Sequence, residues 1–290
     1  MPWYIFALCS ALLASAAALT EKKMLSKEHS LEFSAALAWI LFLISSPLFF
    51  FLDYHALQVR PLMILFGYTV LTACAFVCVA KAVRRMELSE VSPMLLWGPA
   101  LTALLAFVTL GEALTLMQSM GIALLLVGAY FLELRQHHWL RPFQVMWQSR
   151  AMHWLLWGLV LYSIGSLFDR YLLAYYRVPP LTFTTFAHAF LAFHFLIMMM
   201  VLRGSFSKVA HIIRQNDGLL IGTAFLVLGY RFVELFAIQA APVGLAVSVK
   251  HMSALFTTII GGELFHENNL PRKVVAAVIM FAGMLLIILK

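Results

Sequence analysis

The second half of this chain repeats the first, and each half holds an odd number of apolar segments long enough to cross a bilayer. Residues 82–134 align with residues 237–289 at a constant offset of 155 positions, without a gap. The alignment places Glu112 on Glu267 and Gly128 on Gly283. Because five spans carry a chain to the opposite membrane face, the second copy must lie inverted relative to the first. The repeat therefore predicts two inverted five-helix units.

Composition identifies lipid as the solvent of these units. The chain is 63% hydrophobic and 11% charged, a balance that a soluble domain cannot bury. Unbroken apolar runs without strict alternation favour helices over a barrel. The three cysteines, Cys9, Cys74 and Cys78, lie inside apolar stretches and are interpreted as packing residues. We therefore expect an all-α membrane protein with no cofactor and no metal site.

Ten transmembrane helices account for most of the chain. The first repeat is expected to cover residues 1–134, a linker residues 135–151, and the second repeat residues 152–290. The first span resembles a signal peptide but lacks a basic n-region, so we expect it to be uncleaved. The spans are predicted at 3–20, 31–52, 62–81, 91–110, 115–134, 152–172, 180–202, 218–238, 243–262 and 271–289.

The basic residues are distributed unevenly between the two membrane faces. Fourteen Lys and Arg residues fall in loops after odd-numbered spans. Only four, Arg60, Arg170, Arg177 and Lys290, fall at the termini and in loops after even-numbered spans. The positive-inside rule then places both termini outside the cytoplasm. Because the charge is scattered over loops, the expected partner is the bilayer surface and not nucleic acid.

The second repeat carries ionisable residues deep within its spans. Glu234 lies eight residues before Pro242 and Lys250 eight residues after it, so a hairpin turning at the proline brings both to the same depth. Arg231 lies one turn from Glu234, and His251 neighbours Lys250. Their counterparts in the first repeat are apolar. One interpretation is a site with excess positive charge that binds an anionic or zwitterionic solute, in which protonation of Glu234 couples to transport. The other is a structural ion pair.

Two further pairs of charges recur near the ends of spans. An offset of 148 positions aligns Glu21 and Lys22 with Asp169 and Arg170. The recurrence indicates a role in the fold, with each pair closing a gate at one face. The alternative, slightly favoured by the position of these residues at the predicted ends of spans, is that their side chains reach out to the headgroups.

Other polar residues are weaker candidates. Glu112 and Glu267 end the fourth and ninth spans and are expected to anchor tight turns. Glu263 lies one turn deeper than Glu267 and remains a candidate gate or interface residue. His188 and His194 are six residues apart on different helix faces, a spacing that disfavours a metal site.

Short motifs in both halves resemble the EamA-type repeat of the drug/metabolite transporter superfamily. The first copy has Leu-Gly-Glu at 110–112, Leu-Thr-Leu at 114–116 and Gly-Ile-Ala at 121–123, and the second has Gly-Gly-Glu-Leu-Phe-His-Glu at 261–267. The resemblance covers nearly the whole chain. It implies a ten-helix inverted-repeat transporter whose central cavity is formed largely by the third, fourth, eighth and ninth helices. It also implies cytoplasmic termini, as in many family members, whereas the charge count places them outside. Members of the superfamily move amino acids and other metabolites, drugs, nucleotide sugars and lipid-linked sugars.

These observations predict a secondary transporter or exporter of a small polar metabolite, such as an amino acid or organic anion, in a bacterial inner membrane. One alternative is a flippase for a lipid-linked or phosphate-bearing headgroup, and another is a membrane assembly partner that transports nothing. No catalytic constellation appears in the sequence, so an enzyme is not expected. The expected partners are a small-molecule substrate and the lipid bilayer. The sequence leaves the oligomeric state open.

Overall fold

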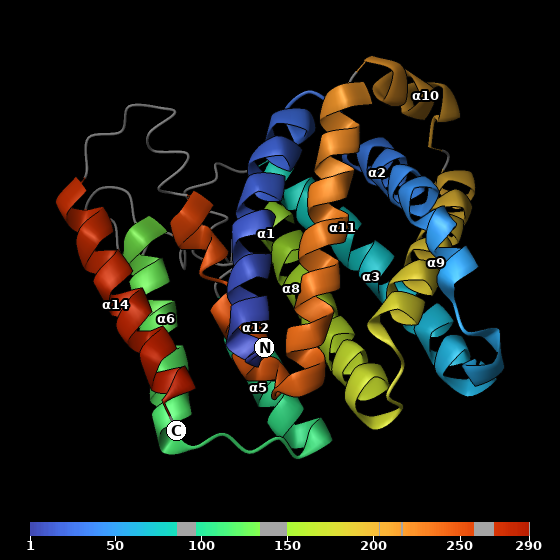
Figure 1. The fold of residues 1–290 in the computed structure, drawn as a ribbon. Helices are drawn as coiled ribbons and strands as arrows, with labels where there is room; N and C mark the ends of the chain where they lie inside the picture. The colour runs from blue at the N-terminus through green and yellow to red at the C-terminus, as the bar shows by residue number, and fades with distance from the viewer. Residues whose placement is uncertain (86–96, 134–149, 203, 216, 258–269, 290) are drawn as a thin grey trace.

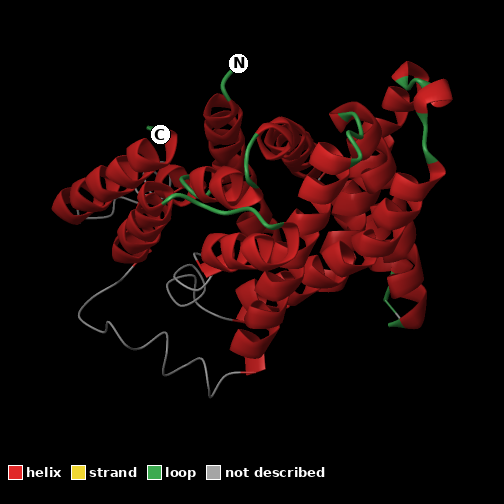
Figure 2. Cartoon of the chain, turned by 90° about the horizontal axis from the view of Figure 1, so that it is seen from below, coloured by secondary structure: helices red, strands yellow, loops and turns green. Residues whose placement is uncertain are grey.

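The computed structural model describes residues 1–85, 97–133, 150–202, 204–215, 217–257 and 270–289, and no strand occurs among them (Figure 2). Short helices η1 (Ser46–Phe51), η2 (Tyr54–Ala56) and η3 (Tyr171–Tyr175) extend or follow the longer ones. The longer helices are α1 (Trp3–Leu25), α2 (Ser30–Ser45), α3 (Val59–Arg85), α5 (Trp97–Leu110), α6 (Leu116–Glu133), α8 (Arg150–Arg170), α9 (Pro180–Val201), α10 (Phe206–Gln215), α11 (Asp217–Ala240), α12 (Val243–Lys250) and α14 (Leu270–Ile288).

A helix occupies each of the ten predicted spans. Within the described residues, six helices are long and apolar enough to cross a membrane, and four apolar helices are shorter. The first residues of the fourth predicted span and the last of the ninth lie outside the described residues. The fold is the predicted all-α membrane architecture of repeated halves.

The helix α10 was not anticipated from the sequence. It buries Val209 and Ile212 and packs against α2, while its basic residues Lys208 and Arg214 are exposed. A helix that is apolar on one side and basic on the other is suited to the membrane interface. We interpret α10 as an interfacial helix that joins the seventh and eighth spans.

The packing of the helices follows the repeat. The first span of each half packs on the third span of the other, as α1 on α11 and α8 on α3. Equivalent helices also pack on each other, as α2 on α9, α5 on α12 and α6 on α14. This reciprocal pairing is expected of two copies related by a pseudo-twofold axis. Both termini lie at one end of the helix bundle, hereafter the terminal face, and α10 lies at the opposite face (Figure 1).

Glycines allow the last helices of the two repeats to approach closely. The pair α6 and α14 stands at one edge of the bundle (Figure 1). A Cβ atom added to Gly121 would lie 2.7 Å from the carbonyl oxygen of Gly283, and one added to Gly128 would lie 2.7 Å from the Met280 side chain. Larger residues would force the backbones apart. The glycine match between Gly128 and Gly283 thus reflects tight helix packing.

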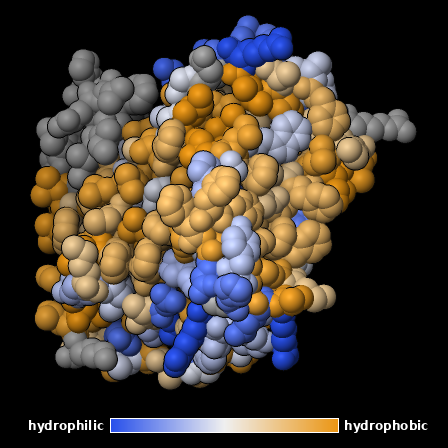
Figure 3. All heavy atoms as spheres, turned by 45° about the vertical axis from the view of Figure 1, so that its right-hand side comes forward, coloured by the Kyte–Doolittle hydropathy of each residue, from blue (hydrophilic) through white to orange (hydrophobic). Residues whose placement is uncertain are grey.

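Buried apolar side chains form two clusters. One includes Leu172, Phe183 and Val243 and continues along α6 and α14, and the other includes Phe33 and Met199. On the visible surface, apolar side chains cover most of the area between hydrophilic groups at the two ends (Figure 3). The surface around the middle of the molecule is thus suited to contact with lipid.

Candidate functional site

A central cavity of about 360 Å³ lies between the two apolar clusters. Seven helices line it, namely α2, α3, α5, α8, α9, α11 and α12. Its volume is within the range of small-molecule sites, which are mostly apolar with a few convergent polar groups. Here the convergent groups are charged, and they come from α8, α11 and α12.

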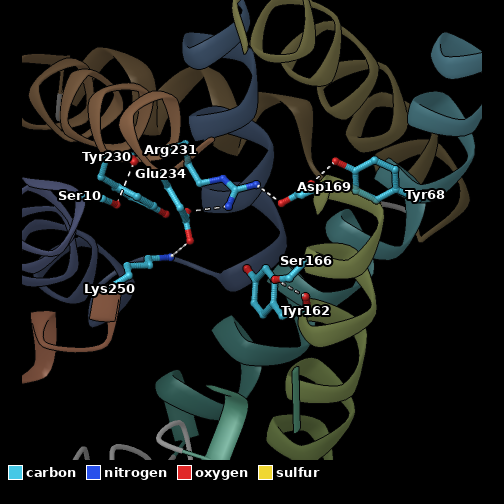
Figure 4. A network of polar contacts seen from close by, with 9 residues as sticks. All are labelled: Ser10, Tyr68, Tyr162, Ser166, Asp169, Tyr230, Arg231, Glu234 and Lys250. Carbon is cyan, nitrogen blue, oxygen red and sulfur yellow. Dashed lines mark hydrogen bonds and ion pairs between the residues drawn. The ribbon is translucent and has the colours of Figure 1, made fainter. Parts of the chain in front are cut away.

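Four charged side chains form one continuous network on the cavity wall (Figure 4). The Arg231 guanidinium donates to Asp169 Oδ2 at 3.0 Å and to Glu234 Oε2 at 2.8 Å. Lys250 Nζ lies 3.2 Å from the other oxygen of the Glu234 carboxylate, Oε1. The Tyr68 hydroxyl donates to Asp169 Oδ1 at 2.5 Å. We call Tyr68, Asp169, Arg231, Glu234 and Lys250 the cavity network.

Neighbouring helices fix the positions of these side chains. The Lys250 ammonium lies 5.0 Å from the ring centre of Tyr230, a cation–π distance. Ser10 on α1 donates to the backbone carbonyl of Tyr230 at 3.0 Å, which ties α1 to α11 beside the network. Asp169 and Glu234 are each only 2% exposed. Buried carboxylates are tolerated because each accepts bonds from charged or hydroxyl donors.

The hairpin argument placed Glu234 opposite Lys250, and the structure has them in contact. Arg231 joins them, and His251 lines the same cavity beside Gly98. The expected excess of positive charge is wrong, however, because Asp169 completes the network. Two carboxylates balance two cations.

The sequence reasoning missed Asp169 and Tyr68 as members of the network. Asp169 was considered a gate residue because the acid–base pair recurs, or a residue that reaches the headgroups because the sixth span was predicted to end at residue 172. In the structure, η3 continues α8 to Tyr175, so that Asp169 lies more than one turn inside the membrane end of its helix. Tyr68 comes from α3, and no local pattern pairs it with Asp169 101 positions away.

A second charged network joins helix ends at the terminal face. Arg170 Nε donates to Glu112 Oε1 at 2.5 Å, and its Nη1 donates to the carbonyls of Ile238 at 2.7 Å and Gln239 at 2.9 Å. The other Glu112 oxygen accepts from the backbone N–H of Val243 at 2.9 Å. We call these contacts the terminal seal, since they join the ends of α5, α8 and α11 to the start of α12. The interpretation that Arg170 reaches to the headgroups is wrong, because its side chain turns inward and is 15% exposed.

The repeat counterparts of Asp169 and Arg170 lie at the end of α1, toward the opposite face. Lys22 is exposed, and Glu21 is half-buried and close enough to Lys250 for their charges to interact. Neither belongs to the terminal seal. The candidate Glu263 and the Glu112 counterpart Glu267 lie outside the described residues.

A second cavity, of about 310 Å³, lies between the central cavity and the terminal face. It is lined by η3, the starts of α3 and α9, and the segment around η2. Leu65 lines the second cavity and Tyr68, one turn along α3, lines the first. Phe183 lines the first and its neighbour Thr182 the second, and the rings of Tyr68 and Phe183 are 6.4 Å apart. Tyr68 and Phe183 therefore lie where the linings of the two cavities are adjacent.

Comparison with protein families agrees with this architecture. The model of the EamA-like transporter family matches residues 1–134 and 149–289, which together are nearly the whole chain. The chain belongs to the EamA-like transporter family. This EamA-like transporter is accordingly an integral multi-pass membrane protein of the drug/metabolite transporter superfamily, whose EamA members are transporters and not enzymes.

Solved structures support the fold of this EamA-like transporter. Matches include 28 chains. One crystal structure superposes with a TM-score of 0.71 over 99% of this chain and 98% of the other, at 15% sequence identity. At that identity, the likeness concerns the fold alone. A search of curated proteins gives no match.

Proposed function

We propose that this protein moves a small zwitterionic solute, of about amino-acid size, across the membrane by alternating access. The observation that carries the proposal is the cavity network, because it places four charges on the wall of a cavity at mid-depth in the bilayer. Charges inside a membrane are costly and generally mark substrate or ion pathways. Arg231, Glu234 and Lys250 have apolar counterparts in the first repeat, which argues against ion pairs that the fold itself requires.

The balance of charge favours a zwitterion over an anion. A solute carboxylate can bond to Arg231 or Lys250, and a solute ammonium can bond to Asp169 or Glu234. Such a solute adds no net charge to the cavity. An anion would add one uncompensated charge to a site of low polarity, which is expensive.

The arrangement of the cavities suggests the route. A bound solute would leave toward the terminal face either after the seal of Arg170 and Glu112 opens or through the second cavity, once the rings of Tyr68 and Phe183 move apart. Tyr68 is bonded to Asp169, so a solute that competes for Asp169 also frees the Tyr68 ring to move. If the terminal face is external, as the basic loops predict, this is the direction of export from a bacterial cytoplasm.

A ligand screen by thermal stability tests the proposal. Purified wild-type protein in detergent is heated with amino acids, organic acids, nucleotide sugars, polyamines and phospholipid headgroups. A ligand at a hundred times its Kd adds about 2.7 kcal/mol of stability. We expect stabilisation by a zwitterion in wild type and in the surface variant Lys208→Ala, and its loss in Lys250→Ala. Each stabiliser is then tested for counterflow in proteoliposomes.

Other outcomes would contradict the proposal. Stabilisation by phospholipid headgroups alone would favour a flippase. No stabiliser at all, together with a large loss of intrinsic stability in Lys250→Ala, would identify the network as a structural ion cluster in a protein whose partner is another membrane protein.

A further inference from the structure

Two polar side chains on α9 face the central cavity without a hydrogen-bond partner among the described residues. The atoms concerned are Thr184 Oγ1 and His188 Nδ1. Thr184 is 3% exposed and His188 6% exposed, and both line the cavity. They are four positions apart, so they lie on one face of the helix. Buried polar atoms in native proteins are nearly always paired, so two orphans side by side require an explanation.

A threonine and a histidine elsewhere on α9 do have partners. Thr185 donates to the carbonyl of Leu181 at 2.8 Å, the usual arrangement for a helical threonine. His194 Nδ1 lies 3.2 Å from the hydroxyl of Thr69 on α3. Thr184 has no such bond to the carbonyl four residues before it. The orphans are therefore confined to the face of α9 that meets the cavity.

The orphan pair belongs to the same cavity as the charged groups. Asp169, Arg231, Glu234 and Lys250 line that cavity together with the pair. The helix α9 also packs against α3 and α11, which carry Tyr68 and Arg231. A single small solute in the cavity can thus meet both sets of groups.

We propose that Thr184 and His188 form a neutral subsite that hydrogen-bonds an uncharged polar group of the solute. This proposal rests on the proposed function and narrows its substrate class to zwitterions that carry a hydroxyl or carboxamide. A threonine hydroxyl donates and accepts, and a neutral imidazole nitrogen does one or the other. Hydroxyl and carboxamide groups can also do both, so they fit either tautomer. A methyl group in their place leaves both orphans unpaired.

Matched pairs of solutes measure the subsite directly. The pairs are serine with alanine, threonine with 2-aminobutyrate, and glutamine with norleucine, and the readout is the apparent Kd from thermal shifts of the full chain. In wild type, the polar member of at least one pair should bind roughly tenfold more tightly, the value of one neutral hydrogen bond. In Thr184→Val or His188→Leu that ratio should fall below about twofold.

Matched variants on the same helix serve as controls. Thr185→Val and His194→Leu remove the paired equivalents, and the ratio within each solute pair should stay near the wild-type value even if these variants are less stable. Because the readout is a ratio, a general loss of stability does not imitate the effect. Equal binding of both members of every pair in wild type would overturn the subsite while leaving zwitterion transport intact.

The ligand-free protein gives an independent test. Replacing Thr184 by valine removes a hydroxyl that has no partner, so the melting temperature should stay the same or rise, whereas Thr185→Val should lower it. Equal losses in both variants would show that Thr184 has a structural partner and would overturn the proposal. If no zwitterion binds, the proposed function fails. In that case a melting temperature that stays the same or rises in Thr184→Val still supports a ligand subsite, and one that falls as much as in Thr185→Val overturns it.

Discussion

The two repeats end their first helices with the same types of residue, an acid followed by a base, and the structure treats the two pairs differently. In the second repeat, Asp169 is 2% exposed and bonded to Arg231, and Arg170 is locked into the terminal seal. In the first repeat, Glu21 is half-buried and Lys22 is exposed. Arg170 thus forms part of the terminal seal, whereas its repeat counterpart Lys22 forms part of no such seal among the described residues.

In the alternating-access cycle proposed above, two copies that exchange roles during transport differ in conformation at any one time. The different bonding of the two pairs is the asymmetry that this proposal expects, with the terminal face closed. Substitutions in the pairs at 21–22 and 169–170 therefore test whether the terminal seal stabilises the protein or whether the helices only meet there without stabilising it.

The largest difference is expected between Arg170→Ala and Lys22→Ala. Removing Arg170 leaves the Glu112 carboxylate, which is 8% exposed, without its cation, and two carbonyls without their donor. Breaking a buried pair in this way costs about 3–5 kcal/mol. Lys22→Ala should change stability by less than about 0.5 kcal/mol. Denaturant unfolding of both purified variants measures the contrast, and similar values for the two would show that the seal contributes nothing.

Labelling distinguishes an opened seal from general destabilisation. With Cys9, Cys74 and Cys78 replaced, a single cysteine at Ser166 reports on the central cavity, which Ser166 lines. A membrane-impermeant maleimide applied from the terminal side should label this cysteine much faster in Arg170→Ala than in Lys22→Ala. Equal labelling rates would mean that the seal does not control access.

A smaller difference is expected between Asp169→Asn and Glu21→Gln. Asparagine at 169 keeps the shape but removes the charge that faces Arg231, and its amide must still accept from Tyr68. A hydrogen bond to a charged group contributes about 1.5–3 kcal/mol, so Asp169→Asn should lose about 2 kcal/mol. Glu21→Gln should lose less than about 1 kcal/mol, because Glu21 is only half-buried. Thermal unfolding in detergent provides the comparison, and a larger loss at Glu21 would reverse the proposed asymmetry.

The spans of this protein could be predicted from its sequence because the length and polarity of a helix in lipid are local properties. The Glu234–Lys250 contact was also predictable, since a hairpin at Pro242 fixes the relative depth of the two residues by helical rise alone. The partner of Asp169 was not, because the Arg231 and Tyr68 contacts depend on how α8 packs against α3 and α11.

The direction in which a charged side chain points could not be predicted from the sequence either. A charged residue near the end of a span can turn outward to water or inward to a partner, and only the packing decides which. Arg170 turns inward because Glu112 and the last carbonyls of α11 lie within its reach. The missing partners of Thr184 Oγ1 and His188 Nδ1 could not be predicted for the same reason, because Thr185 and His194 have identical side chains but different neighbours.

The smallest and most specific effect is expected from exchanging the two bases. Arg170→Lys keeps the charge but replaces a planar fork by a single ammonium, which cannot keep the same bonds to Glu112 and to the carbonyls of Ile238 and Gln239. It should lose about 1 kcal/mol, one net hydrogen bond, and should raise the labelling rate of the Ser166 cysteine only slightly. Lys22→Arg should change neither quantity, because Lys22 makes no bond in the terminal seal that a fork could improve. If Arg170→Lys instead matches wild type in both measurements, the seal depends on charge alone, and the geometry of the guanidinium is not what distinguishes the second repeat from the first.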